Sequence, residues 1–399
     1  MKDDSSRISW FRPLKRAIKL LVLGFVYLPF SFLFLLMRIR IVVLTSPHRI
    51  GHLCVEPDTF LKERFLGLQA TFKPVFLIPK DIVANRAMLR LWQQKLSIVT
   101  MPALCRILAP FKRFRWVDYP IERYAVAIDS TAASPAIQAK WGSRPPMLML
   151  DEKERMQGFE ALEKLGIPRT GWFVCVHSRD GNYSPGDEHL HSYRNCKIGN
   201  YRLAMNAIVE RGGWCVRVGE PTSIAFPDGE RFIDYANSPQ KSEWMDIFLA
   251  ANCHFFLGNS SGLFFLSMVF GRRSALANMV PMSCSLPVGP GDLGIPKLLR
   301  SRESGELIMF RSILQSPVSN FRFSWQYEQA GIDVEENSPE DIRDLAVEML
   351  DSLAGEPERE AADEQLQEQF HGLFRPGHYS YGAGSRIGRD FLREHGRLL

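Results

Sequence analysis

Short apolar runs alternate with helix-like segments along most of this 399-residue chain. Apolar runs bounded by Gly, Ser or Asp predict strands, and apolar positions three to four residues apart predict amphipathic helices. The predicted strands are 40–44, 74–78, 96–101, 172–176, 214–218, a short one near Phe232, 253–257 and 274–277. The predicted helices are 56–65, 84–94, 104–111, 151–165, 200–211, 244–251, 263–270, 338–351, 356–369 and 386–395. This alternation indicates an α/β protein with parallel sheets.

The pattern is interrupted at residues 166–171, Gly-Ile-Pro-Arg-Thr-Gly, where we place a domain boundary. A chain of this length favours two domains. We predict two Rossmann-like domains that face a cleft, at 40–168 and 169–355. They are preceded by a basic and hydrophobic segment at 1–39 and followed by a helical tail at 356–399.

An uncharged run of 18 residues, Leu20 to Met37, lies between basic residues near the N-terminus. As a helix it would be about 27 Å long, which is marginal for a bilayer core. No small-residue cleavage motif follows, which argues against a signal peptide. Two interpretations stay open: a membrane-spanning helix, or a segment kinked at Pro29 and embedded in one leaflet.

The net charge of +5 comes from the N-terminus. Residues 1–50 hold nine Lys/Arg and two Asp, whereas the rest of the chain holds 40 Lys/Arg and 42 Asp/Glu. A near-neutral body argues against nucleic-acid binding, and the basic N-terminus indicates contact with a membrane surface. The seven cysteines are scattered without a CxxC pair, so we expect no zinc and a reducing, cytosolic compartment.

Two polar turns that follow predicted strands have the composition of anion sites. Asn259, Ser260, Ser261 and Gly262 connect the strand at 253–257 to the helix at 263–270. Unpaired amides and the helix dipole favour a phosphate at such a turn. His177, Ser178, Arg179, Asp180 and Gly181 directly follow the strand at 172–176. Two such turns predict a nucleotide site at the carboxyl edge of a parallel sheet.

Arg179 is the strongest catalytic candidate, with Asp180 beside it, because a guanidinium can bind a diphosphate and stabilise its growing charge. His177 lies on the same strand face as Arg179 and is a donor-binding candidate. Arg217 and Gly219 end the strand at 214–218 at the same sheet edge, and Glu220 is a candidate for a ribose contact, with an exposed loop acid as the alternative. The alternatives stay open: Arg179 in an ion pair with Asp180 or Asp187, and the 259–262 turn as a plain helix cap.

Two further groups complete the predicted site. Tyr193, Arg194 and Asn195 lie in a long polar loop and are candidates for contacts with a sugar or base. His52 is a candidate general base and Glu56 a residue to orient it, against the alternative of a buried histidine in a capping loop. No Asp-x-Asp pair has a metal-chelating context, so we predict a metal-free mechanism without a cofactor.

Several of these segments resemble a bacterial family of inferred glycosyltransferases linked to surface polysaccharide and lipopolysaccharide genes. The likeness runs from about residue 40 to the C-terminus. One difference is Gly271-Arg272-Arg273, where Gly-Arg-Pro would be expected. The His-x-Arg element also resembles, more distantly, the one that fucosyltransferases use to hold a GDP-sugar, over too few residues to identify the donor. The segments that carry the family resemblance are 49–53 (RIGHL), 177–183 (HSRDGNY), 191–195 (HSYRN), 258–262 (GNSSG) and 378–382 (HYSYG).

The resemblance implies a GT-B-like, metal-independent glycosyltransferase at the cytoplasmic face of the inner membrane. The domain at 40–168 would bind a lipid-linked or polysaccharide acceptor, and that at 169–355 a nucleotide-sugar donor. Two alternatives remain open: another envelope transferase, such as a pyruvyl or glycerophosphate transferase, and a non-catalytic nucleotide- or glycan-binding protein.

Overall fold

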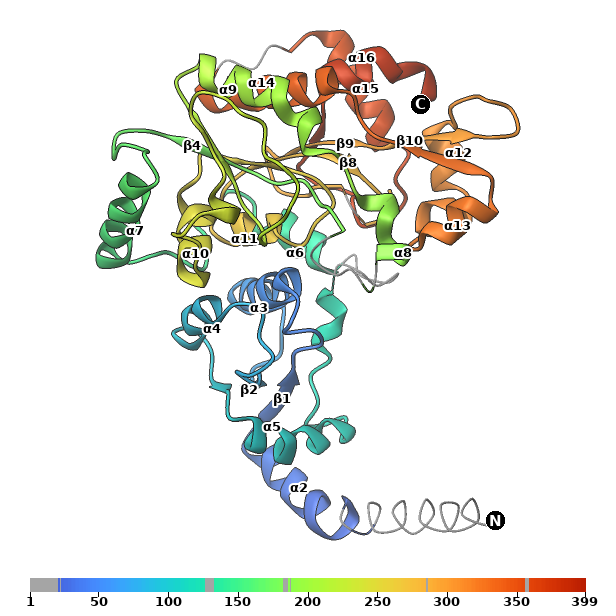
Figure 1. The fold of residues 1–399 in the computed structure, drawn as a ribbon. Helices are drawn as coiled ribbons and strands as arrows, with labels where there is room; N and C mark the ends of the chain where they lie inside the picture. The colour runs from blue at the N-terminus through green and yellow to red at the C-terminus, as the bar shows by residue number, and fades with distance from the viewer. Residues whose placement is uncertain are drawn as a thin grey trace, which may run out of the picture.

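The computed structural model describes residues 21, 23–125, 133–181, 186, 188–284, 286–355 and 359–399. Two α/β units follow one another along the chain, each built on a parallel sheet (Figure 1). The predicted α/β class and parallel sheets are therefore confirmed.

The first unit has a three-stranded sheet in the order β1-β2-β3, with β1 at Ile39–Val43, β2 at Lys73–Leu77 and β3 at Ile98–Val99. The backbone of Ile41 also bridges Asp118 in parallel. Buried Phe60 packs edge-on against Phe76 of β2, with ring centroids 5.1 Å apart. The helices of this unit are α3 (Ile50–Phe65), α4 (Arg86–Gln93), α5 (Pro102–Leu108) and α6 (Ala133–Trp141).

Helix α3 begins at Ile50, six residues before the predicted start, so His52 lies in its first turn and not in a loop. The prediction was wrong because Pro57 is typical of a first helical position. In the interior of α3, Pro57 cannot donate to the carbonyl of Leu53. The indole Nε1 of Trp92 donates to that carbonyl instead, at 2.8 Å. A tertiary contact therefore lets the helix continue through the proline.

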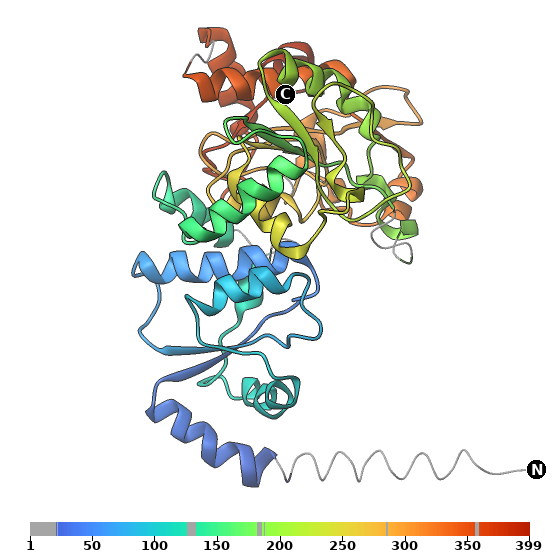
Figure 2. The same ribbon diagram turned by 60° about the vertical axis from the view of Figure 1, so that its left-hand side comes forward.

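The second unit is built on a seven-stranded parallel sheet in the order β12-β9-β8-β7-β4-β5-β6. Helices α9, α14 and α16 cover one face, and α7, α10 and α11 cover the other (Figures 1 and 2). The strands are β4 (Phe173–Val176), β5 (Trp214–Arg217), β6 (Phe232–Ile233), β7 (Phe256–Gly258), β8 (Ser274–Met279), β9 (Leu293–Pro296) and β12 (Arg386–Ile387). The covering helices are α7 (Glu152–Lys164), α9 (Arg202–Glu210), α10 (Glu243–Asn252), α11 (Phe264–Val269), α14 (Pro339–Ala354) and α16 (Arg389–His395).

The sequence did not predict a two-stranded sheet with two short helices, which lies between β9 and α14. β10 (Leu298–Ser301) pairs antiparallel with β11 (Ile332–Glu335). Helices α12 (Phe310–Leu314) and α13 (Ser324–Gln329) lie between these strands, and α13 contacts α8 (Glu188–His191). The segment between β10 and β11 therefore brings residues near 323 beside the loop that carries Tyr193.

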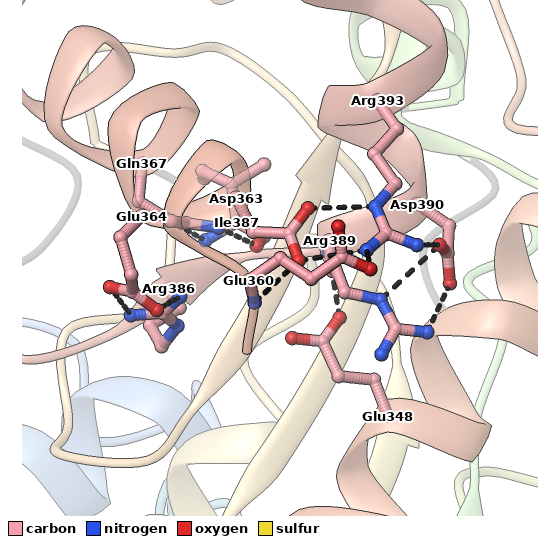
Figure 3. Close-up of polar contacts among 10 residues, drawn as sticks. All are labelled: Glu348, Glu360, Asp363, Glu364, Gln367, Arg386, Ile387, Arg389, Asp390 and Arg393. Atoms are coloured by element: carbon pink, nitrogen blue, oxygen red, sulfur yellow. Dashed lines mark hydrogen bonds and ion pairs between the residues drawn. The ribbon is translucent and has the colours of Figure 1, made fainter. Parts of the chain in front are cut away.

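The C-terminal segment, predicted as a helical tail, also contributes the edge strand β12 to the main sheet. Figure 3 shows how side chains fasten it: Arg393 of α16 contacts Asp363 of α15 (Ala361–His371) at 2.7 Å. Arg386 of β12 contacts Glu364 at 2.8 Å, and the backbone N–H of Arg389 donates to Glu348 of α14 at 2.7 Å. These contacts join α14, α15, β12 and α16 into one layer.

The two units are in direct contact, α3 against α11 and α4 against α10. The Asn85 side chain donates to the carbonyl of Glu243 at 2.8 Å, and the N–H of Arg86 donates to the Glu243 carboxylate at 2.7 Å. A cavity of about 220 Å³ lies between α4, α7 and α10, and none of the predicted site residues lines it. One hydrophobic core runs through both units.

The predicted membrane segment falls partly on residues 1–20 and 22, which lie outside the described residues. In the described part, the π-helix η1 (Leu23–Tyr27) leads into α2 (Leu28–Leu36), an apolar helix at the end of the first unit away from the second (Figures 1 and 2). None of the helices among the described residues has the length and apolar character needed to cross a bilayer.

Candidate functional site at a strand-order switch

The strand order of the large sheet reverses between β4 and β7. From β4 the chain builds outward through β5 and β6, and it then returns to place β7 on the other side of β4. In open α/β sheets, the crevice beyond the carboxyl ends of the strands at such a switch point binds ligands. The two predicted anion turns lie there, since His177 to Arg179 follow β4 and Asn259 follows β7.

Asn259 joins the two turns. Its side chain is buried, accepts a hydrogen bond from the N–H of Arg179 at 3.0 Å, and donates to the carbonyl of Arg194 at 3.0 Å. The guanidinium of Arg194 donates in turn to the carbonyl of Ser260, at 3.1 Å from Nε and 2.5 Å from Nη2. Asn259 was predicted to contact donor phosphates, but both of its polar atoms bind protein. Asn259 therefore has a structural role, which is to hold the segments of Arg179 and Arg194 together.

Arg179 is largely buried and belongs to a side-chain network. Its Nη1 donates to the amide oxygen of Asn195 and lies 3.9 Å from Glu188. Asn195 also donates to Glu188. Arg179 does form an ion pair, but with Glu188 and not with the predicted Asp180 or Asp187, of which Asp187 lies outside the described residues. Burial and the nearby Arg194 guanidinium lower the pKa of Arg179. Two partly buried guanidiniums therefore lie near one another, with Glu188 beside Arg179, so an added anion would find favourable charge here.

Among the residues of the 259–262 turn, Ser261 is the one whose side chain remains partly exposed, and its own N–H donates to the carbonyl of Asn259 at 2.6 Å. Its Oγ accepts from the N–H of Leu263 at 3.3 Å. The hydroxyl of Ser260, predicted to bind phosphate, donates to the carbonyl of Val280 at 2.9 Å and accepts from its N–H at 3.0 Å. Gly262 faces the other unit, because a Cβ there would lie 3.2 Å from the backbone nitrogen of Gly51. Ser260 therefore holds the turn against Val280, and Gly262 lets the turn approach the first unit closely.

His177 is held beside β5. Burial lowers its pKa from 6.5 to about 4, so the imidazole is neutral near pH 7. Its Nδ1 lies 3.1 Å from the carbonyl of Val218, which can only accept, so Nδ1 carries the proton and Nε2 has a free lone pair. Gly219 adopts φ +128° against this ring. A side chain at Gly219 would be strained and would press on His177.

Two other candidates, Arg217 and Asp180, point toward protein groups, and a third, Glu220, does not. Arg217 is buried, with Nη1 2.7 Å from the carbonyl of Ile224 and 3.5 Å from Asp234. Asp180 accepts from the hydroxyl of Thr222 at 3.0 Å, and Glu220 is exposed. The structure therefore brings Asp180 and Arg217 to the loop after β5, at the same sheet edge as Arg179, and the Asp180 charge also acts on the Arg179 guanidinium.

Tyr193 was predicted to contact a base or sugar, but its ring is buried. It packs against Tyr327 of α13 with centroids 5.1 Å apart, and burial raises its pKa. Its neighbours Arg194 and Asn195 do reach the switch point, as described above. Because a 3-10 turn at Ser192–Arg194 sends consecutive side chains in different directions, the three residues separate.

His52 and Glu56 are the predicted site residues that lie in the first unit. His52 Nδ1 lies 2.6 Å from Oε1 of fully buried Glu56. A carboxylate accepts, so Nδ1 donates and Nε2 is left as a base. Burial raises the pKa of Glu56, and the hydrogen bond from His52 opposes that shift. Gly51, next to His52, touches the 259–262 turn, which brings the pair to the switch-point side of the second unit.

Comparisons with known proteins identify no family by sequence: no family model and no curated protein matches this chain. Among solved structures, a glycosyl transferase family 9 protein from Veillonella parvula matches with TM-score 0.46 and 10% identity, over 79% of this chain and 97% of that one. E. coli ADP-heptose LPS heptosyltransferase II matches with TM-score 0.36 and 11% identity, over 60% and 84%. The heptosyltransferase TibC from enterotoxigenic E. coli, in complex with ADP-D-beta-D-heptose, matches with TM-score 0.37 and 14% identity, over 64% and 62%.

These similar structures are glycosyltransferases, and at such low TM-scores the likeness carries no inference about activity here. The motif resemblance of the sequence stays a prediction.

Two residues of the site were not predicted from the sequence. Lys297 is buried and donates from Nζ to the carbonyl of Asn195 at 2.6 Å. Burial lowers its pKa. A lysine directly after the buried strand β9 is a detectable signal, but β9 contains Gly294 and Pro296 and was not predicted. Glu188 begins the one-turn helix α8 in a polar stretch of sequence without a periodic pattern, and only the fold shows that it meets Arg179.

A possible metal-ligand group among the described residues lies elsewhere. Asp341, Glu394 and His395 place their ligand atoms within 4.8 Å of one another, on α14 and α16. Asp341 already accepts from the N–H of Ser338 at 2.9 Å as part of a helix cap. This group lies on the opposite face of the sheet from α10 and α11, so it is separate from the switch point.

Proposed function

We propose that this protein is a GT-B-like glycosyltransferase that moves a sugar from a nucleotide-sugar donor to a lipid-linked or polysaccharide acceptor of the cell envelope. The donor diphosphate would lie at the switch point, against Arg179, Arg194 and the amides near Ser261. The second unit would bind the donor and the first unit the acceptor.

The observation that carries this proposal is the convergence of two partly buried guanidiniums, those of Arg179 and Arg194, at the strand-order reversal. Asn259 holds the backbone of both arginines, and their guanidiniums donate to Asn195 and to the carbonyl of Ser260, so the positive charge is held in place before a ligand arrives. Preorganised charge of this kind stabilises a leaving diphosphate with little reorganisation. A nearby His–carboxylate pair from the other unit suits deprotonation of an acceptor hydroxyl.

The roles follow from these positions. His52 would take the acceptor proton on Nε2, with Glu56 holding the ring and stabilising the imidazolium that forms. Arg179 would take up the charge that develops on the leaving phosphate. Asp180 would help to place the loop after β5, through Thr222. The transfer would need neither a metal nor a cofactor, because guanidiniums and helix amides supply the positive charge.

The predicted anchor at 1–39 would keep the enzyme at the cytoplasmic face of the inner membrane, where a lipid-linked acceptor is concentrated. Nucleic acid is not an expected partner because the body of the chain is near neutral.

The test is transfer of a labelled sugar from a panel of nucleotide-sugars to membrane lipids and glycans by the full chain, with and without a chelator. We expect one donor to label a glycan acceptor in both conditions. His52→Ala should retain donor binding and lose transfer by roughly 100-fold or more. Transfer of a pyruvyl or glycerophosphate group, or nucleotide binding without any transfer, would contradict the proposal. Loss of donor binding in chelator would contradict its metal-free form.

A further inference from the structure

An apolar surface outside the N-terminal segment lies on α5. Met101, Leu104 and Ile107 are 60%, 39% and 57% exposed and are spaced three residues apart, so they share one face of the chain there. The opposite side is anchored, since Cys105 is buried and its Sγ contacts the carbonyl of Val99 at 3.1 Å. α5 is thus held to the sheet with its apolar face outward, the reverse of a surface helix of a soluble protein.

This surface continues into the N-terminal elements. Phe111 of η2 (Ala109–Arg113) packs against Phe34 of α2 and Tyr27 of η1, with centroids 4.6 and 4.9 Å apart. Leu36 of α2 and Phe25 of η1 are about 80% exposed. Both views place α2 and α5 at the end of the first unit away from the second (Figures 1 and 2). We name the exposed apolar side chains of α2 and α5 the end surface.

The charge around the end surface is mainly positive, although Asp81 lies near Cys105 of α5 and Asp118 near Lys112. Residues 82–117 contain seven Lys/Arg and no Asp or Glu. Four of the seven, Arg106, Lys112, Arg113 and Arg115, lie on or just after α5 and are exposed. Apolar side chains bordered by cations fit a bilayer with anionic headgroups, because the apolar groups enter the acyl boundary while the cations remain among the phosphates.

We propose that α5 and η2, together with α2, form an interfacial docking surface for an anionic lipid bilayer. This proposed contact does not require residues 1–20, and it does not depend on the transfer chemistry. It would fix how the first unit stands on the membrane. A large exposed apolar patch on a folded protein marks an interaction site, and the positive border identifies lipid phosphate as the complementary partner.

The first experiment places an environment-sensitive fluorophore on the full chain at Ile107→Cys, with Met149→Cys as the matched control. Met149 is 71% exposed and lies outside the end surface. Six of the seven native cysteines are buried, so background labelling is measured on the unsubstituted chain. With phosphatidylglycerol vesicles we expect a blue shift and an intensity gain of about twofold or more at position 107 and none at 149.

The second experiment measures co-sedimentation with the same vesicles. Leu104→Glu with Ile107→Glu should lower binding by about tenfold, whereas Met149→Glu with Met156→Glu should not. All four side chains are exposed, so the fold should be retained, as circular dichroism checks. High salt should weaken the wild-type binding.

Three results would overturn the proposal. In one, the protein sediments with vesicles while the label at 107 does not respond, so only the N-terminal segment touches lipid. In another, the label responds without vesicles as protein concentration rises, so a second copy covers the surface. In the third, neutral phosphatidylcholine vesicles give the same response and affinity as anionic ones.

Discussion

At the scale of single residues, the central feature of the switch point is the largely buried guanidinium of Arg179. Burial of a guanidinium costs free energy unless charge and hydrogen bonds compensate. Asn195, Glu188 and the carbonyl of His191 provide that compensation, the last at 3.3 Å from Nη1. Arg194 opposes it through repulsion, which also lowers the pKa of Arg179. A bound diphosphate would therefore relieve a repulsion that the free protein carries.

His177 gives a stability prediction at the same scale. Burial lowers its pKa from 6.5 to about 4 in the folded chain. As pH falls from about 6.5 to about 4, the unfolded histidine binds a proton that the folded one does not. Stability is therefore full above about pH 6.5 and falls through that window.

Between pH 7.5 and 4.5 the unfolding free energy of the wild type should fall, and protonation linked to His177 should account for as much as about 3 kcal/mol of that fall. In His177→Gln we expect the fall to be smaller by this amount, as measured by urea titration. His189→Gln, at an exposed position, is the control and should leave that loss unchanged. An equal loss in His177→Gln and wild type would show that the imidazole titrates freely in the folded protein.

Sequence alone located several side chains of the site but not their partners. Arg179, Arg194 and His177 follow from strand ends and loop composition. Ser260 and Asn259 have the same polar character as a ligand-binding residue, yet their side chains bind Val280, Arg179 and Arg194. A polar residue in a turn does not reveal whether its partner is a ligand or another segment, because the partner segment is set by the tertiary fold.

At the scale of elements, helix–helix contacts in the second unit depend on small residues. Gly158 of α7 lies against Phe248 of α10, and a Cβ at Gly158 would fall 1.9 Å from the Phe248 ring. Phe248 is fully buried and stacks on Trp244 at 5.7 Å, so the ring has little room to move.

We expect Gly158→Ala to lower the unfolding free energy by a net of about 1–2 kcal/mol, because overpacking exceeds the gain in helix propensity. Gly199→Ala is the control, since no atom lies within 4 Å of a Cβ there. Urea denaturation measures both. A Gly158→Ala chain as stable as wild type would mean that α7 shifts away from α10 at little cost.

Elements with strong local signals were predicted well. The Ser338 cap is confirmed, with the N–H of Asp341 donating to its hydroxyl at 3.0 Å, and α14 begins at Pro339 as expected. β12 was not predicted because two residues at a sheet edge carry no period of their own. The start of α3 was misplaced because the partner that replaces the missing N–H of Pro57 is Trp92, 35 residues further along the chain.

At the scale of the whole molecule, the α/β class and the parallel sheets followed from the strand–helix alternation, whereas the strand order did not. The position of β7 beside β4 creates the switch point, and nothing in the local pattern specifies that neighbour. The contact between Gly51 and Gly262 likewise joins two residues more than 200 positions apart. Long-range pairing of this kind decides where the site lies.

The same arrangement separates two tasks. The 259–262 turn meets the start of α3, the helix that carries His52 and Glu56, where the two units touch. Helices α2 and α5, which carry the end surface, lie at the far end of the first unit (Figure 1). An enzyme of this shape would be held to a bilayer by one end while its second unit takes the donor from solution. The two functions can therefore be tested by separate substitutions.

Calorimetric titration of the full chain with a series of nucleoside diphosphates tests the central claim, that the switch point binds a donor diphosphate, most directly. We expect one nucleotide to bind, and Arg179→Ala to weaken it by roughly 10- to 100-fold, as for loss of one charge-assisted hydrogen bond. Arg211→Ala, which removes a surface arginine paired with Asp351, should bind as wild type does. A folded Arg179→Ala chain with unchanged affinity, or a wild-type chain that binds none of the series, would contradict the account.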